Sequence, residues 1–102
     1  MIVLSDHSGR AVRLTDERLA HILEHSEMQG QEQRIAETLL TPGSVILSYH
    51  DSTVHLYHRL FEETPVTCKY LVVAVKYLEQ DAFVITAFFT DKEKKGTRIW
   101  PQ

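Results

Sequence analysis

The sequence predicts a single α+β domain, in which N-terminal helices pack on an antiparallel sheet of four or more strands. Its 102 residues are 43% hydrophobic and 25% charged, as is usual for one globular domain. Between residues 16 and 40 the apolar residues recur at helical spacing. After Pro42 the pattern changes to short runs of β-branched and aromatic residues that are separated by turn-forming residues.

The first forty residues predict a small hairpin and two helices. The stretch "MIVLSDHSGRAVRL" places two short apolar runs around a turn. Thr15 can cap a helix over residues 16–27, because acidic residues follow it in the first turn. A second helix over residues 31–40 ends before "TPG".

Four strands are expected in the rest of the chain, over residues 44–50, 53–61, 67–78 and 82–90. The gaps between them are too short for crossovers, so each strand should pair antiparallel with the next, as in a meander. The segment "RIW" near the end adds a short edge strand. Burial is expected for five apolar residues: Leu19, Leu23, Leu56, Ile85 and Phe89.

Strand alternation also predicts which side chains share a face. Leu56 and its apolar neighbours should face the helices, which would place Tyr57 and Arg59 on the uncovered face. With Lys69 and Thr86 on the same side, that face would carry a polar, cationic patch.

The chain has the features of a cytoplasmic protein. Its N-terminus lacks the basic region and long apolar run of a signal peptide, and the longest apolar run, "YLVVAV", is too short to span a membrane. The one cysteine, Cys68, excludes an internal disulfide and is expected to be buried in a strand.

The charges are unevenly distributed although the net charge is only −3. Residues 1–51 hold four basic and eight acidic residues, whereas residues 52–102 hold seven basic and six acidic residues. The segment "KEKKGTR" carries four of the positive charges. An anionic ligand should therefore contact the C-terminal half.

His21 and His25 stand four residues apart in the first predicted helix, so they would share one face with Arg18. Three interpretations are open: a metal site, a pair of acid/base groups, or exposed surface residues. A metal site requires at least three protein ligands, and no third ligand stands out, so neither a metal nor another cofactor is expected.

Metal-independent RNA cleavage would suit these residue types. The reaction needs a base for the ribose 2′-OH, an acid for the leaving oxygen, and cations for the charged transition state. Histidine can serve in both proton-transfer roles, and Arg59 and Lys69 can bind phosphate. Tyr57 and Thr86 can donate hydrogen bonds to it.

The order of four segments resembles the phage-associated branch of the barnase–EndoU–colicin–RelE nuclease superfamily, the PBECR-type domains. These segments are "RLTDERLAHILEHSEM", "VHLYHRLF", "KYLVVAVKY" and "FVITAFFTDKEKKG", and they span roughly residues 11–100. The resemblance implies one nuclease domain over residues 1–102, with a helix-plus-meander fold and metal-independent ribonuclease activity of the toxin type. It also implies a set of catalytic residues: His21, His25, Arg59, Lys69 and Thr86. Ser26 stands where the family often has proline.

The leading hypothesis is therefore a cytoplasmic endoribonuclease that acts on RNA and is paired with an antitoxin or immunity protein. Its substrate would contact five further side chains: Arg18, Tyr57, Lys92, Lys94 and Lys95. The main alternative is a non-catalytic module of the same fold that binds RNA or protein. A structural subunit of a phage-related assembly is a third interpretation.

Overall fold

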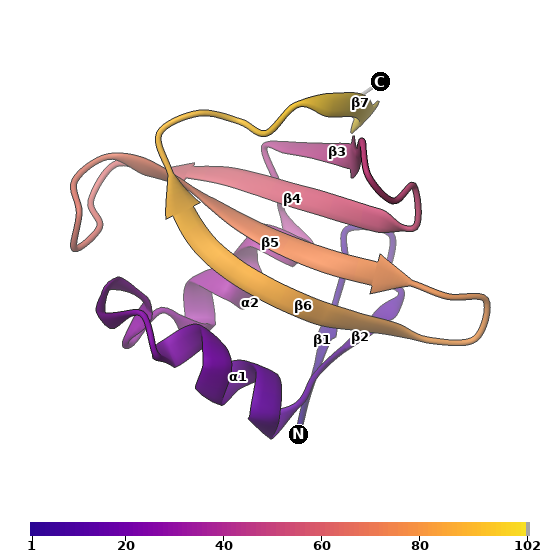
Figure 1. Cartoon of the computed structure of the whole chain (residues 1–102), viewed down its shortest axis with the longest axis horizontal. Coiled ribbons are helices and arrows are strands. Elements are labelled where there is room, and N and C mark those ends of the chain that lie inside the picture. The colour runs from indigo at the N-terminus through magenta and orange to yellow at the C-terminus, as the bar shows by residue number, and fades with distance from the viewer. Residues whose placement is uncertain (102) are drawn as a thin grey trace.

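The protein is an α+β domain with two helices and a seven-stranded, mostly antiparallel sheet (Figure 1). The computed structural model describes residues 1–101. The helices are α1 (Asp16–Leu23) and α2 (Glu32–Leu40), with a short 3₁₀ turn, η1 (Ser26–Met28), between them. The strands are β1 (Ile2–Ser5), β2 (Ala11–Leu14), β3 (Ser44–Ser48), β4 (Val54–Phe61), β5 (Lys69–Tyr77), β6 (Ala82–Thr90) and β7 (Gly96–Trp100).

The strands lie in the order β1-β2-β6-β5-β4-β3-β7. Strands β3 to β6 pair antiparallel in chain order, and β1 and β2 form the N-terminal hairpin. Two connections go beyond the expected meander. Strand β2 pairs parallel with β6, and β7 returns across the sheet to pair with β3 at the far edge.

The first helix is shorter than the sequence predicts. Thr15 caps α1 by accepting a hydrogen bond from the Arg18 N–H at 3.2 Å, but the helix ends at Leu23 rather than at residue 27. His25 adopts an extended conformation before η1, where Met28 enters the core with no exposed surface. The chain turns here because residues 24–27 are polar, and burial of Met28 favours the tighter turn.

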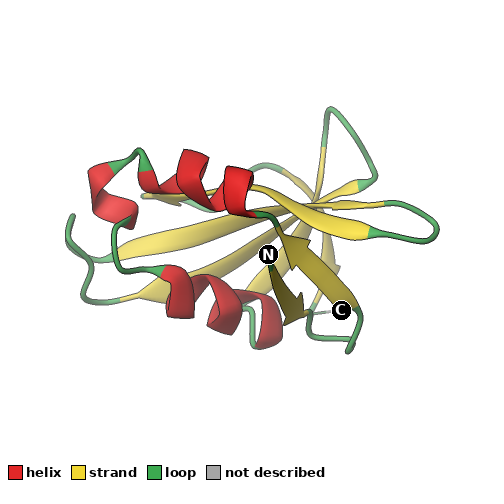
Figure 2. Cartoon of the chain, turned by 90° about the horizontal axis from the view of Figure 1, so that it is seen from below, coloured by secondary structure: helices red, strands yellow, loops and turns green. Residues whose placement is uncertain are grey.

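Both helices pack on one face of the sheet (Figure 2). Ile22 of α1 and Ile35 of α2 share one core with Leu71, Val73 and Val75 of β5. The register of β4 and β5 shows what else faces the helices, because directly paired residues project from the same side of a sheet.

The predicted assignment of faces is wrong for β4. Tyr57 pairs with Val73 and Arg59 pairs with Leu71, so both side chains lie on the helix-covered face. Thr86 pairs with Ala74 on the opposite face, so the expected patch on an uncovered face does not form. Alternation separates two sets of side chains but cannot tell which set the helices cover.

The buried set also differs from the expected one. Leu56 and Ile85 are only half-buried, and the three remaining predicted residues (Leu19, Leu23 and Phe89) pack at the border of the core. Cys68, expected inside a strand, is exposed just before β5.

The second face of the sheet is covered in part by the connection from β6 to β7. Residues 91–95 cross this face, and beneath them His58 and Val72 are fully buried. Within residues 1–101 no helix has the length and apolar character that crossing a membrane requires.

Candidate active site

A cavity of about 270 Å³ opens on the helix-covered side of the sheet, beside the β1–β2 turn. Six of its lining side chains are ionisable: Asp6, His7, Arg10, His55, Tyr57 and Tyr77. Ser8 and Ile99 complete the wall. The cavity therefore joins the turn at residues 6–10 with strands β4, β5 and β7, which are far apart in the chain.

A chain of three hydrogen-bonded groups forms one side of the cavity. The Tyr77 hydroxyl donates to Asp6 Oδ2 at 2.7 Å, so it accepts from the Tyr57 hydroxyl, which lies 2.6 Å away. Burial raises the pKa of Tyr57 to about 12 and raises the pKa of Tyr77 as well, so both remain protonated at neutral pH.

Asp6 is the anchor of this chain and is only 3% exposed. Its Oδ1 accepts three hydrogen bonds within the turn, from the Ser8 N–H, the Ser8 hydroxyl and the Arg10 N–H, at 2.7–2.9 Å. Burial alone would raise the pKa of Asp6, but the hydrogen bonds from Tyr77, Ser8 and Arg10 hold it below its usual value. Asp6 is therefore a buried carboxylate that ties the turn to β5.

Two histidines flank the tyrosines. The His55 ring lies 4.3 Å from the Tyr77 ring, and the His7 ring lies 5.7 Å from the Tyr57 ring, measured between ring centroids. His7 also contacts Trp100, with the ring centroids 5.3 Å apart. Burial lowers the pKa of His55 most strongly, and nearby His7 and Arg10 lower it further while Asp6 opposes them, so His55 is neutral at pH 7.

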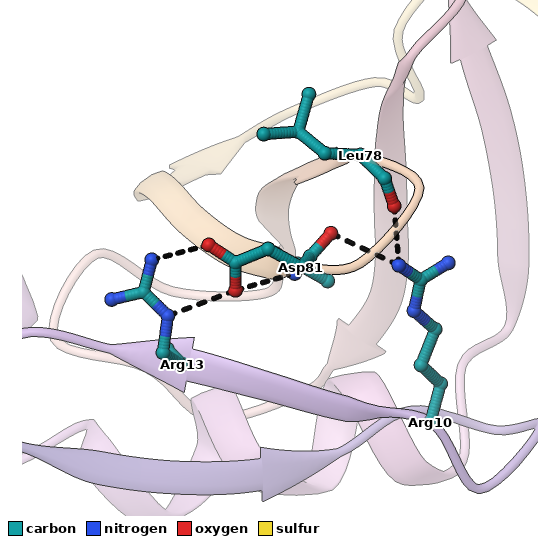
Figure 3. A network of polar contacts seen from close by, with 5 residues as sticks. Arg10, Arg13, Leu78 and Asp81 are labelled. Carbon is teal, nitrogen blue, oxygen red and sulfur yellow. Dashed lines mark hydrogen bonds and ion pairs between the residues drawn. The ribbon is translucent and has the colours of Figure 1, made fainter.

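Arg10 contributes a positive charge to the lining of the cavity. Its guanidinium is held by the β5–β6 turn (Figure 3). One terminal nitrogen donates to the carbonyl oxygens of Leu78 and Asp81, and the guanidinium carbon lies 5.2 Å from the centroid of the Tyr77 ring. Arg13 holds the same β5–β6 turn through two bonds to the Asp81 carboxylate, at 2.9 and 2.6 Å. Arg10 is thus fixed by one terminal nitrogen, and its other terminal nitrogen makes no hydrogen bond to residues 1–101.

This arrangement contains the groups that acid/base catalysis on an anionic substrate requires. A neutral, half-buried histidine, a second, exposed histidine and an arginine line the same cavity, with a protonated tyrosine pair behind them. Histidines of this kind can accept and donate protons near neutral pH, and a guanidinium can stabilise charge that develops on a phosphate. Within residues 1–101, no three His, Cys, Asp or Glu side chains come together as metal ligands.

Of the side chains that the sequence suggested, only Tyr57 lines this cavity. Arg18 and His21 are exposed on α1, and His21 Nδ1 lies 3.5 Å from Glu24 Oε2 on the helix surface. His25 is exposed as well, and because it lies beyond the end of α1 it does not share a helix face with His21. The two histidines therefore do not lie together on one continuous helix, although the sequence predicts that they do.

The other suggested side chains lie in different surroundings. Arg59 donates to the carbonyl and hydroxyl oxygens of Thr41, and its guanidinium lies 5.5 Å from the Phe61 ring centroid. Lys69 forms an ion pair with Asp91, and Thr86 is half-buried on the opposite face. The three exposed lysines, Lys92, Lys94 and Lys95, belong to the segment that crosses that face.

The cavity residues were missed because they are distant in the sequence. His55 and Tyr57 do share a strand face, which alternation indicates correctly, but Asp6 and His7 sit in "DHSG", which the sequence marks only as a turn. The sequence does contain one indication that Asp6 has a structural role, which is the serine two positions after it. An Asp side chain can accept a hydrogen bond from the backbone N–H two residues on and so fix a turn.

Comparisons of the chain with family models, curated proteins and solved structures gave no match.

Proposed function

We propose that this protein is a metal-independent endoribonuclease whose active site is the cavity between the β1–β2 turn and β4–β5. The observation that supports this proposal is that two histidines and an arginine, from segments about 45 residues apart, line one cavity of about 270 Å³. Metal-independent cleavage requires this combination of a base, an acid and a cation.

The proposed roles follow from the surroundings of each side chain. His55 is neutral at pH 7 and accepts the proton of the ribose 2′-OH, whose oxygen then attacks the adjacent phosphorus. His7 is exposed at the mouth of the cavity and donates a proton to the departing 5′-oxygen. Arg10 stabilises the charge on the pentacoordinate phosphorus. One P–O bond forms and one breaks, which leaves a 2′,3′-cyclic phosphate and a free 5′-hydroxyl.

The tyrosines and Asp6 hold the histidines in place. The Tyr57 and Tyr77 hydroxyls are engaged with each other and with Asp6, so their rings provide fixed surfaces for the imidazoles. We include in the proposal the toxin-type role that the sequence suggests: action on RNA in the cytoplasm and control by an antitoxin or immunity protein.

The decisive experiment measures cleavage of a single-stranded RNA in excess chelator and identifies the product ends. The parent protein should cleave the RNA and leave 2′,3′-cyclic phosphates. The double variant His7→Ala/His55→Ala should lose at least about 10²-fold in rate, because proton transfer contributes about 10²–10⁴-fold.

The matched control is the double variant His21→Ala/His25→Ala, which removes the same number of imidazoles from exposed positions. It should cleave like the parent. If this control loses activity while the cavity variant keeps it, the active site lies at the helix and the assignment to the cavity is wrong. If the parent cleaves no RNA, the ribonuclease proposal fails and a binding module of the same fold remains.

A further inference from the structure

A second concave surface lies on the opposite face of the sheet and has a different character. It is a groove of about 420 Å³ where the β3–β4 turn meets the segment before β7. Its walls are formed by Ser48, Tyr49, His50, Leu56, Lys94 and Lys95. His55 lines the catalytic cavity and its neighbour Leu56 lines this groove, so the two sites lie back to back across β4.

The lysines of the groove carry charge that no described residue neutralises. The segment 91–95 contains two acidic residues, but both engage cations elsewhere: Asp91 pairs with Lys69, and Glu93 lies 3.6 Å from Arg98. Lys94 and Lys95 form no ion pair with any residue in 1–101, although the protein as a whole is negatively charged. The groove is thus a local positive patch, which favours an anionic ligand.

The path of the backbone holds these lysines over the sheet. His58 Nε2 accepts a hydrogen bond from the Lys94 N–H at 2.9 Å, and the Glu93 carboxylate accepts one from the Ser44 hydroxyl. The Lys94 ammonium lies 5.1 Å from the centroid of the Phe88 ring. The segment is therefore attached at two points beside the groove, so binding would order little additional chain.

Tyr49 adds an aromatic surface to this positive patch. It is 72% exposed at the end of β3, and its ring contacts no other aromatic ring or cation among the described residues. His50, next to it, is exposed as well. Free aromatic rings beside lysines are the features with which proteins bind single-stranded nucleic acid, because bases stack on the rings and phosphates contact the cations.

We infer that this groove, defined by Tyr49, His50, Lys94 and Lys95, is a binding site for single-stranded RNA outside the catalytic cavity. A base stacks on Tyr49, and the adjoining phosphates contact Lys94 and Lys95. The choice of RNA rests on the proposed function, whereas binding at the groove does not require cleavage. RNA held here would be retained near the β3–β4 turn, around which it can reach the cavity on the other face.

The test measures binding of a fluorescent, fully 2′-O-methylated RNA 12-mer by anisotropy at several salt concentrations. This RNA cannot be cleaved through its 2′-oxygens, so a failure of the ribonuclease proposal does not affect the result. Tyr49→Ala should weaken binding about 10-fold, whereas Tyr49→Phe, which keeps the ring, should bind like the parent. Lys94→Gln/Lys95→Gln should weaken binding and lower the slope of log K against log salt by about 1.4, since each phosphate contact to a single strand contributes about 0.7.

Lys92→Gln is the matched control, because it removes the same charge from the same segment at a residue that does not line the groove. It should lower affinity less than either Lys94→Gln or Lys95→Gln. Equal losses at all three lysines, or unchanged binding in Tyr49→Ala, would overturn the groove as the site. Absence of RNA binding by the parent at low salt would overturn the choice of RNA and leave a protein as the ligand to consider.

Discussion

Two pairs of histidines in this protein differ in how they are brought together. His21 and His25 are four residues apart in the sequence, but α1 ends between them and both are exposed. His7 and His55 are 48 residues apart, yet they contact the same hydrogen-bonded tyrosine pair in one cavity. Close spacing in the sequence produces a shared site only if the secondary structure continues through both residues.

The surroundings of the two pairs differ as well. The cavity pair is supported by a buried carboxylate and two tyrosines with raised pKa values, whereas the helix pair has one neighbouring glutamate at the surface. Enzymes use buried neighbouring groups of fixed orientation to position their acid and base residues, and only the cavity pair has such neighbours.

The largest effect is expected for His55 on catalysis. His55→Ala should lower kcat by about 10²–10⁴-fold, because it removes the proposed general base. Burial lowers the pKa of His55, so its neutral form persists below pH 6.5 and the parent should remain active under mildly acidic conditions. The measurement is the pH–rate profile of RNA cleavage, with His21→Ala as an exposed control that should retain the parent profile. An unchanged kcat in His55→Ala would remove the cavity pair from the mechanism.

A large loss of stability is expected at Asp6. Asp6→Ala leaves the Tyr77 hydroxyl and the N–H groups of Ser8 and Arg10 without their acceptor, which should lower the free energy of unfolding by about 2–4 kcal/mol. Asp16→Ala, at an exposed position in the first turn of α1, should change it by less than about 1 kcal/mol. Urea denaturation of both variants measures the difference, and equal effects would show that Asp6 is not an anchor.

A moderate dependence on pH is expected from His58, the buried histidine on the opposite face. Its Nδ1–H donates to the Leu56 carbonyl at 3.0 Å and its Nε2 accepts from the Lys94 N–H, so the folded protein holds the neutral form. Burial is the main cause that lowers the pKa of His58; repulsion from Lys94 and Arg98 adds to it, while the bond to Leu56 and attraction to Glu93 act against it.

The unfolded chain therefore binds more protons than the folded protein below about pH 6.5, and stability falls as the pH is lowered from that value towards the folded pKa. Titration of His58 should change the free energy of unfolding by at most about 1.4 kcal/mol per pH unit, and His55 contributes in the same direction. At pH 7.5 His58→Gln should have a lower free energy of unfolding than the parent, and between pH 7.5 and pH 5.5 this free energy should fall by less than it does in the parent. His50→Gln should show the same dependence on pH as the parent. Denaturation curves at several pH values decide between these outcomes.

The smallest effect is expected at the helix pair. His21→Ala and His25→Ala should each change the free energy of unfolding by less than about 0.5 kcal/mol, because both side chains are exposed and the contact of His21 with Glu24 is a surface pair. Thermal unfolding of both variants measures this. A loss of more than 1 kcal/mol at His25 would mean that it supports the turn into η1.

Much of the secondary structure could be predicted from local patterns. The predicted strand at residues 82–90 agrees with β6, and the predicted helix at residues 31–40 agrees with α2 to within one residue. The N-terminal hairpin and the C-terminal edge strand were also expected and are present. These elements follow from the spacing of apolar residues and from turn residues, which act over a few neighbours.

The candidate site could not be predicted in the same way. Asp6, Tyr77 and Tyr57 come from three separate elements, and their hydrogen bonds depend on how the β1–β2 hairpin meets the edge of β6. That junction is a parallel pairing, which no turn between the strands specifies. Which face of β4 the helices cover was equally undetermined, because either set of alternating side chains contains residues that can be buried.

The sequence by itself therefore determined the α+β class, the positions of most strands, and the separation of His55 and Tyr57 from Leu56 and His58 on opposite faces of β4. The tertiary structure alone decided that the helices cover the face with Tyr57, that α1 ends before His25, and that the β1–β2 turn brings His7 into the same cavity as His55. The physical reason is the distance in the sequence over which each kind of interaction acts. Periodicity and capping depend on residues within one or two turns of each other, whereas the cavity depends on burial and hydrogen bonds between segments that meet only when the whole core is packed.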